Sequence, residues 1–466
     1  MSAQHRDLLT EAGFEELSER QLAMPFIHEA VPKATDHTVA AMGALFADHD
    51  REALRDRGAA IRDEVIADLD GHLANLVAAC EAKGVVVHRA TDAAHAREIV
   101  RGIVRAADAR TVVKSKSMMS EEIELNPALE ADGVKVVETD LGEYVVQVSG
   151  DRPSHIIAPV IHLPREKVRE SLSAVAGEQL PPEAEALTAW AREELRASFL
   201  AAEVGITGVN FGVAETGTLV LVTNEGNARM TTSLPRVHVA LMGIERVVPR
   251  MEDLAVMLPL LTGHGTGQQI SCYVTMIDGP RREDEPDGPE EQHLVLIDNG
   301  RSALAQSEYA EILRCIRCGA CQNICPVYRQ VGGHAYGWVY GGPIGAVLTP
   351  LLRGDEDGGE LAQASSLCAA CDDICPVKIP LHELLLKLRR RRAEGDSAPR
   401  VEKIAFALWS RAWSLPWVYR LSGPLGRLTL LPLARGGRVR RAPAPLARWT
   451  RGRSLPLPAR RPFHRR

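Results

Sequence analysis

The stretch CIRCGACQNICP (315–326) places four cysteines and a proline at the spacing of a bacterial ferredoxin, Cys-x2-Cys-x2-Cys-x3-Cys-Pro. Three thiolates on such a tight loop can reach three irons of one cubane, while the fourth cysteine points toward a second cluster. A zinc site is the alternative, but zinc sites are built from separate Cys-x2-Cys pairs. The spacing therefore predicts an iron–sulfur cluster.

A second, shorter motif follows in SSLCAACDDICP (365–376), where Ser365 stands in the position of the opening cysteine. The fourth cysteine of each motif is expected to cross over to the other cluster. The predicted ligands are Cys315, Cys318, Cys321 and Cys375 for cluster 1, and Cys325, Cys368 and Cys371 for cluster 2. Cluster 1 is then expected to be [4Fe–4S]. Cluster 2 is either [3Fe–4S], or [4Fe–4S] with a fourth iron that is open or bound by a non-cysteine group such as Ser365.

The overall composition is that of a globular protein, with 45% hydrophobic and 25% charged residues. A chain of 466 residues predicts two or three domains. Seven of the nine cysteines fall within 315–375, which suits metal binding in a reducing compartment better than disulfides. Neither a signal-peptide pattern nor an apolar run long enough to span a membrane is visible. We therefore expect a cytoplasmic protein.

The charge is unevenly distributed along the chain. Residues 401–466 contain fifteen Lys and Arg but one acidic residue, so they carry +14 and the preceding 400 residues carry −20. Phe406, Trp409 and Trp413 would share one face of a helix in this tail. Such a helix can fold back on the protein, dock on an acidic partner or lie peripherally on the inner face of a membrane. Nucleic-acid binding is not expected, because the body is acidic.

Before the cysteines, strand-like and helix-like segments alternate. Residues 85–89, 111–115 and 134–140 are predicted strands, and 92–109 and 121–133 are predicted helices, the second with Ser120 as its N-cap. This alternation predicts an α/β domain with a mostly parallel sheet. The expected domains are a helical region (1–68), an α/β domain (69–303), a dicluster ferredoxin-type domain (304–388) and a basic tail (389–466).

The α/β domain offers several candidate site residues. Lys114 and Lys116 end a strand and can face a ligand at the carboxyl edge of the sheet. A glycine-rich stretch can hold an anion through its backbone N–H groups; its candidates are Gly263, His264, Gly265 and Gly267. Solvated lysines and simple tight turns are the alternatives. No nucleotide fingerprint with Rossmann or Walker spacing is present.

Several long stretches together resemble the lactate-utilisation iron–sulfur proteins of the LutB/LldF type. They are RCGACQNICPVY (317–328), SSLCAACDDICPVKIPLHELL (365–385), SKSMMSEEIELNPALEADGVKVVETDLGEYVVQ (115–147) and GVNFGVAETGTLVLVTNEGNARMTTSLP (208–235). The resemblance covers roughly residues 20–400, and its second motif has three cysteines as here. The Arg-rich tail is less typical of it.

The resemblance implies a LUD domain, similar to the NagB/RpiA/CoA-transferase group, followed by an all-α ferredoxin domain. It also implies electron transfer in a complex that oxidises L-lactate to pyruvate, with two partners: a cysteine-rich-domain iron–sulfur protein and a second LUD protein. By analogy with CoA-transferases, Glu215 in AETGT is a catalytic candidate. The alternatives are a stand-alone LUD enzyme acting on a small carboxylate or CoA-type substrate, and a scaffold that uses its clusters structurally.

Overall fold

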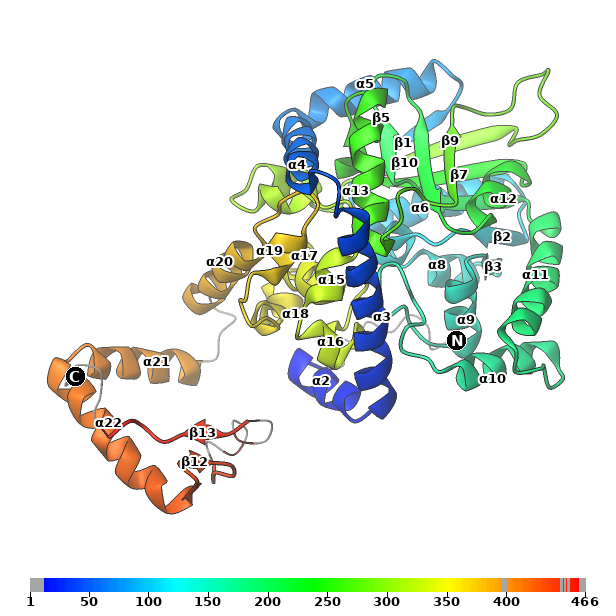
Figure 1. The fold of residues 1–466 in the computed structure, drawn as a ribbon. Coiled ribbons are helices and arrows are strands. Elements are labelled where there is room, and N and C mark those ends of the chain that lie inside the picture. Colours follow the sequence, from blue (N-terminus) through cyan, green and yellow to red (C-terminus); the bar gives the residue numbers. More distant parts are fainter. Residues whose placement is uncertain (1–11, 396–399, 445–446, 448–449, 451–452, 461–466) are drawn as a thin grey trace. The chain divides into compact units, whose positions relative to one another are not determined.

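A computed structural model describes residues 12–395, 400–444, 447, 450 and 453–460. The chain forms two compact units, Met1–Arg390 and Arg391–Arg466 (Figure 1). The first unit contains the α/β region and both cysteine motifs.

The first unit is built on a six-stranded, fully parallel sheet. In spatial order its strands are β1 (Val86–Ala90), β10 (Glu291–Ile297), β7 (Val237–Gly243), β4 (Val204–Gly208), β2 (Thr111–Lys114) and β3 (Lys135–Glu138). The last of these six strands along the chain, β10, lies between β1 and β7, so the sheet is complete only when the whole α/β region has been made. The predicted parallel α/β fold is confirmed.

Helices cover both faces of this sheet because its strands are apolar on both sides. Val239 and Leu241 of β7 pack in one cluster with α6, while Ala240 and Met242 pack in another with α5. The helices of the α/β region are α5 (Leu69–Glu81), α6 (Ala93–Ala106), α7 (Met118–Glu122), α8 (Leu125–Ala131), α9 (Leu141–Ser149), α10 (Arg165–Ala176), α11 (Ala184–Ala201), α12 (Asn227–Ser233) and α13 (Leu254–Thr266).

The predicted helix over 121–133 is wrong in its bounds. Two short helices, α7 and α8, replace it, because Glu124 adopts a left-handed conformation with φ 52° between them. Ser120 lies inside α7, and Ser117 is the N-cap, accepting a hydrogen bond from Ser120 N at 3.2 Å. The helix therefore begins three residues earlier than expected, shortly after strand β2.

A second, four-stranded sheet lies beside the main one. Its order is β8 (Val247–Val248), β5 (Phe211–Val213), β6 (Leu219–Thr223) and β9 (Tyr273–Ile277). The short apolar runs between 206 and 248 therefore divide between two sheets. Val220 of β6 packs in the same buried cluster as Cys315, so this small sheet borders the cysteine region.

The cysteine region is made of short helices. They are α14 (Arg301–Ala305), η4 (Ala310–Arg314), α15 (Ala320–Ile324), α16 (Tyr328–Val331), η5 (His334–Tyr336), α17 (Gly342–Arg353), α18 (Asp355–Gly358), η6 (Gly359–Gln363), α19 (Ala370–Ile374) and α20 (Leu381–Glu394). The N-terminal helices α2 (Phe14–Leu22), α3 (Pro25–Leu45) and α4 (Arg51–Ala67) pack on this region and on α13. The start of the chain is therefore part of the cysteine region's support.

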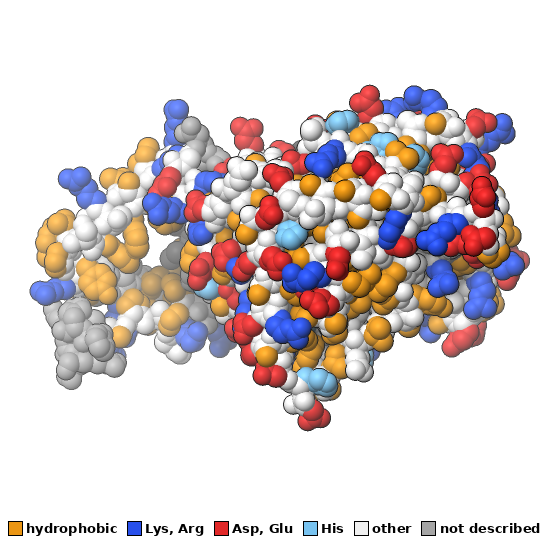
Figure 2. Space-filling view, turned by 90° about the horizontal axis from the view of Figure 1, so that it is seen from above, with side chains coloured by type: hydrophobic (Ala, Val, Ile, Leu, Met, Phe, Trp, Pro, Cys, Tyr) orange, Lys and Arg blue, Asp and Glu red, His pale blue; other side chains and the backbone are white. Residues whose placement is uncertain are grey.

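The second unit contains α21 (Arg400–Trp413), α22 (Pro416–Leu430) and three two-residue strands, β11 (Ala434–Arg435), β12 (Arg438–Val439) and β13 (Leu455–Pro456). No described residue of α21 or α22 is buried. Hydrophobic side chains with Lys and Arg among them gather over this unit (Figure 2). Within the described residues, no helix has the length and apolar character needed to cross a membrane.

Candidate metal centre and adjoining cavity

The two cysteine motifs fold into loops with the same backbone. Arg317 and Leu367, at equivalent positions, both have positive φ, of 59° and 54°. Two residues later Gly319 and Ala369 do so again, at 76° and 60°. Each loop then enters a five-residue helix, α15 or α19, and these two helices pack against each other. Non-glycine residues rarely adopt positive φ, so its repetition shows that one loop design is used twice.

Ser365 occupies the place of Cys315 in this repeated loop. The backbone N–H of Arg317 donates to Cys315 Sγ at 3.4 Å, and the N–H of Leu367 donates to Ser365 Oγ at 3.1 Å. The serine hydroxyl therefore lies where the missing thiol of the second motif would lie.

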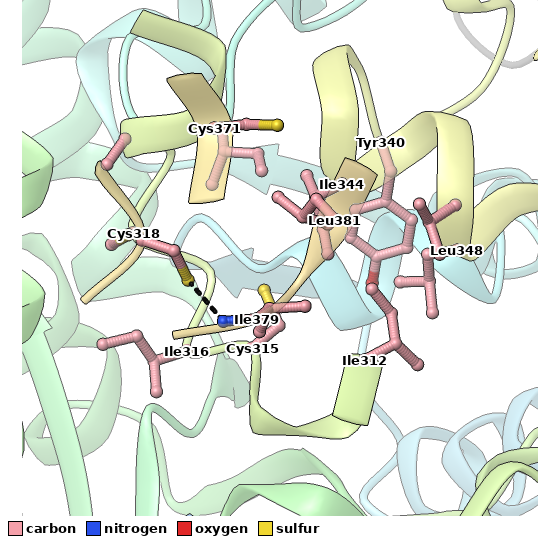
Figure 3. Packing of buried hydrophobic residues seen from close by; sticks show 14 of the residues in the cluster. Ile312, Cys315, Ile316, Cys318, Tyr340, Ile344, Leu348, Cys371, Ile379 and Leu381 are labelled. Carbon is pink, nitrogen blue, oxygen red and sulfur yellow. Dashed lines mark hydrogen bonds between the residues drawn. The ribbon is translucent and has the colours of Figure 1, made fainter. Parts of the chain in front are cut away.

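The thiols of the first group are buried close together. Burial raises the pKa of Cys318, and the neighbouring thiols of Cys375 and Cys315 raise it further. Burial, followed by the proximity of Cys315 and Cys318, also raises the pKa of Cys321. Figure 3 shows Cys315 and Cys318 among the buried isoleucines of this region. Cys375, from the second motif, thus lies beside cysteines of the first.

The remaining three cysteines form a second group. Burial and the carboxylate of Asp372 raise the pKa of Cys371, and Cys325 and Cys368 add to the rise. Burial, with Cys368 nearby, raises the pKa of Cys325. Cys368 itself is exposed, so this group lies closer to solvent than the first. The two groups follow the cross-over between the motifs, while the ligand assignment itself stays a prediction.

This donor set fits iron–sulfur clusters. Thiols packed together in a buried site keep their protons, because thiolate charges there are poorly solvated and repel one another. When iron replaces those protons, its positive charge neutralises the thiolates. Backbone N–H groups also point at sulfur, as Ile379 N does at Cys375 Sγ, at 3.4 Å. Such N–H···S contacts tune the potential of a cluster.

Buried arginine side chains contact the first cysteine loop. Arg246 donates to Cys315 O at 3.0 Å and to Ile316 O at 3.1 Å. Arg317, inside the motif, lies 4.8 Å above the Tyr340 ring and 3.3 Å from Glu245. Burial disfavours its charge, yet Tyr340, Cys315 and Glu245 together raise the pKa of Arg317. A permanent positive charge therefore lies beside the predicted cluster 1, whose four thiolates make it an anion.

Helix α4 contributes further arginines on one face. Arg55 donates to Cys375 O at 2.8 Å and to Asp372 O at 2.9 Å. Arg62, which is fully buried, donates to Val247 O at 2.8 Å and to Leu313 O at 3.0 Å. These arginines are not among the residues predicted from the sequence; their only signal is a spacing of seven residues, which places them on one helix face.

A cavity of about 380 Å³ adjoins the first loop. It lies at the carboxyl edge of the main sheet, the usual ligand position in open α/β sheets. Residues following β2, β4 and β7 line it, and Arg317 and Tyr340 reach it from the cysteine region. The cavity and the predicted cluster 1 therefore share one wall.

The predicted lysines have different surroundings. Lys116 lines the cavity, where it lies 3.5 Å from Glu143 and donates to Ile157 O at 3.2 Å. Lys114 is fully buried between Glu121 and Glu138, each at 2.8 Å. Burial opposes its charge, but the two carboxylates raise the pKa of Lys114, so it is a structural cation that does not line the cavity.

The glycine-rich stretch does not form an anion-binding loop. Gly263, His264 and Gly265 lie in the last turns of α13, and Gly267, with φ 72°, ends it. His264 is buried, and its Nδ1 bonds Leu260 O at 3.0 Å. Of these four residues only Gly265 lines the cavity, and a Cβ there would lie 3.0 Å from Cys318 O. The glycines bring α13 close to its neighbours.

The catalytic candidate Glu215 lies away from the cavity. Its Oε2 accepts a hydrogen bond from Met251 N at 3.1 Å, so it caps the short helix η3 (Met251–Asp253). The acids that do line the cavity are Asp140, Glu225 and Glu245. Burial, helped by the carboxylate of Asp140, raises the pKa of Glu225 to about 7. Nothing in the local sequence distinguishes Glu225, because its burial depends on distant segments.

Three family models match the chain: the LUD domain (residues 73–297), the 4Fe-4S dicluster domain (311–379) and the C-terminal domain of lactate utilisation protein B (388–466). Curated relatives called lactate utilization protein B match the chain with similar sequence identity. The chain is 46% identical to that of Shouchella clausii over 98% of this chain and 96% of the relative. It is 46% identical to that of Geobacillus kaustophilus over 86% and 85%.

A crystal structure of a DUF162 family protein from Deinococcus radiodurans matches 51% of this chain and 98% of that chain, with 12% identity and a TM-score of 0.27.

We predict that Glu225→Gln changes how stability depends on pH. A carboxyl whose pKa rises on folding, here from 4.5 to about 7, binds more protons in the folded state, so its contribution to stability falls as pH rises across that window. Melting temperatures measured at about pH 5 and pH 8 should therefore show the variant gaining on the wild type at the higher pH. The exposed Glu185→Gln should show no such gain; a pH-independent difference for Glu225→Gln would contradict the assignment.

Proposed function

Because this chain belongs to the lactate utilization protein B family, we propose that it is the electron-transfer subunit of a complex that oxidises L-lactate to pyruvate. In this proposal two clusters carry the electrons. The observation that supports it most directly is the pair of loops with one backbone design, whose seven thiols lie in two neighbouring groups.

The proposed complex contains a cysteine-rich-domain iron–sulfur protein and a second LUD protein. Cluster 2 is the proposed point of exchange with a partner, since Cys368 is exposed and electrons must leave through a solvent-facing edge. Cluster 1, enclosed by Arg246 and the cavity wall, is the inner centre. We also propose that the LUD domain shares the architecture of the NagB/RpiA/CoA-transferase group.

Two cysteine variants test the proposal. Cys318→Ser should remove cluster 1 and Cys371→Ser cluster 2, so each should lower iron content by about half. Both should abolish L-lactate-dependent reduction of an acceptor by the complex assembled with its partners. Cys272→Ser, exposed and outside both motifs, should retain iron and activity. Lactate oxidation by this chain alone, or by a complex whose clusters are lost, would overturn the proposal in favour of a stand-alone LUD enzyme.

For cluster 2 we propose that Ser365 faces the iron that lacks a thiolate. Ser365→Cys then completes a four-cysteine set, and the variant should retain [4Fe–4S] under mild oxidation. The wild type should lose one iron and show the electron paramagnetic resonance signal of oxidised [3Fe–4S]. Ser366→Cys, one residue along the same loop and exposed, is the matched control. The assignment fails if the two variants behave alike.

For the second unit we propose contact with an anionic membrane surface. Trp409, Trp413 and Trp417 are 52%, 43% and 63% exposed, on a unit rich in arginine. Tryptophan and arginine together favour the interface between lipid headgroups and acyl chains.

Replacing the three tryptophans by alanine in the full chain should reduce its co-sedimentation with anionic liposomes several-fold. Leu200→Ala, which removes an equally exposed apolar side chain from the first unit, should leave it unchanged. If both variants co-sediment with the liposomes to the same extent, or if the wild type does not co-sediment at all, the membrane proposal fails. A protein partner would then be the surface that the second unit contacts.

A further inference from the structure

The cavity beside the first cysteine loop is lined by charged side chains that have no part in the proposed electron transfer. Its charged lining comprises Lys116, Arg246 and Arg317 against Asp140, Glu225 and Glu245. Arg246 is occupied by two carbonyl groups, and Glu245 is paired with Arg301 at 2.7 Å. Lys116 and Arg317 then remain against Asp140 and Glu225, which is two positive groups against two acids. A singly charged anion therefore fits this lining better than a multiply charged one.

Lys116 is the cation best placed for such a ligand. Its ammonium group has three donors, and its two observed contacts are Ile157 O and the more distant Glu143. Asn210, also in the lining, uses its oxygen to accept from Val222 N at 2.8 Å, which leaves its amide nitrogen as a donor. Two donors from neighbouring strand ends can therefore bind the oxygens of one anion.

Phosphate groups fit this cavity poorly. Helix N-termini bind phosphates through free backbone N–H groups. The helices α7 and α9 begin at the cavity, but their own caps already fill that role: Ser117 accepts from Ser120 N, and Asp140 accepts from Glu143 N at 3.1 Å. Apolar side chains complete the walls, among them Met118, Leu221, Val222 and Leu261. A small organic acid, part anionic and part apolar, matches this lining.

The same ligand would lie against the loop of cluster 1. Arg317 lines the cavity and stands between the predicted ligands Cys315 and Cys318. Gly265, also in the lining, approaches the carbonyl oxygen of Cys318 so closely that a Cβ would be 3.0 Å from it. A charge placed in the cavity is therefore separated from cluster 1 by little more than one layer of side chains.

We propose that this cavity binds a small monocarboxylate at Lys116 and that its occupancy is coupled to the oxidation state of cluster 1. The proposal rests on the proposed function for the presence of cluster 1. An anion beside the cluster makes adding an electron harder, so the ligand lowers the potential, and reduction of the cluster weakens binding by the same factor.

The test measures binding of L-lactate, pyruvate and inorganic phosphate to the full chain by calorimetry, with cluster 1 oxidised and then reduced. We expect a carboxylate to bind, phosphate to bind at least tenfold more weakly, and the oxidised protein to bind the carboxylate more tightly. A tenfold preference corresponds to a potential about 59 mV more negative with the ligand bound, which a redox titration measures independently.

Lys116→Gln should weaken carboxylate binding at least tenfold, and Lys116→Arg should retain most of it. Val222→Trp should block binding by filling the cavity without changing its charge. The control is Lys167→Gln, at an exposed lysine of α10. This variant should bind the carboxylate as tightly as the wild type does. Melting temperatures show whether each variant is folded.

Absence of carboxylate binding, binding unaffected by both Lys116→Gln and Val222→Trp, or equal affinity for phosphate would overturn the site. Binding without a shift in potential would overturn the coupling. Failure of the clusters to assemble would show in the iron content and would count against the proposed function, while calorimetry on the cluster-free protein would still report the affinity of the cavity.

Discussion

Guanidinium groups bonded to carbonyl oxygens hold the cysteine loops against the sheet, and the rest of the first unit depends on them. Arg62 joins α4 to both the small sheet and the segment before Cys315, Arg55 holds the second motif, and Arg246 holds the first. Hydrogen bonds to charged groups contribute about 1.5–3 kcal/mol each, so the pair on each motif offsets part of the conformational freedom that the loop gives up. Because the loop backbone is held in this way, the thiols lie close to one another.

The surroundings of the two thiol groups are unequal. The first group has cations beside it, N–H groups directed at sulfur and a cavity wall around it. The second has the exposed Cys368 and a serine in place of one thiol. If both hold clusters, positive surroundings favour the reduced state of cluster 1 over that of cluster 2. The enclosed centre beside the cavity would then hold an added electron more strongly than the open centre at the surface.

Local sequence patterns predicted the local structure well where one interaction dominates. The apolar run near 111–115 became β2, because residues buried on both faces of a parallel sheet are apolar almost without interruption. The run near 85–89 became β1, which lies at the edge of the sheet. The pattern failed over 121–133, where the left-handed Glu124 divides one predicted helix into two. It failed again at 263–267, where glycines predicted a loop; they belong to α13, and at Gly263 a Cβ would lie 2.7 Å from the ring of Phe46.

The sequence by itself determined the chemistry of the cysteine motifs, because the four-residue and shorter spacings within each loop are set by the covalent chain. The inequality of the two motifs, with Ser365 in the place of a cysteine, was visible in the same way. Only the tertiary structure decided what surrounds them. Arg62, Arg246 and Glu225 reach their positions through contacts between segments far apart in sequence, such as the 251 residues that separate Arg62 from Leu313. No short-range pattern records such contacts, since they arise when the sheet closes and the desolvated charges must find their partners.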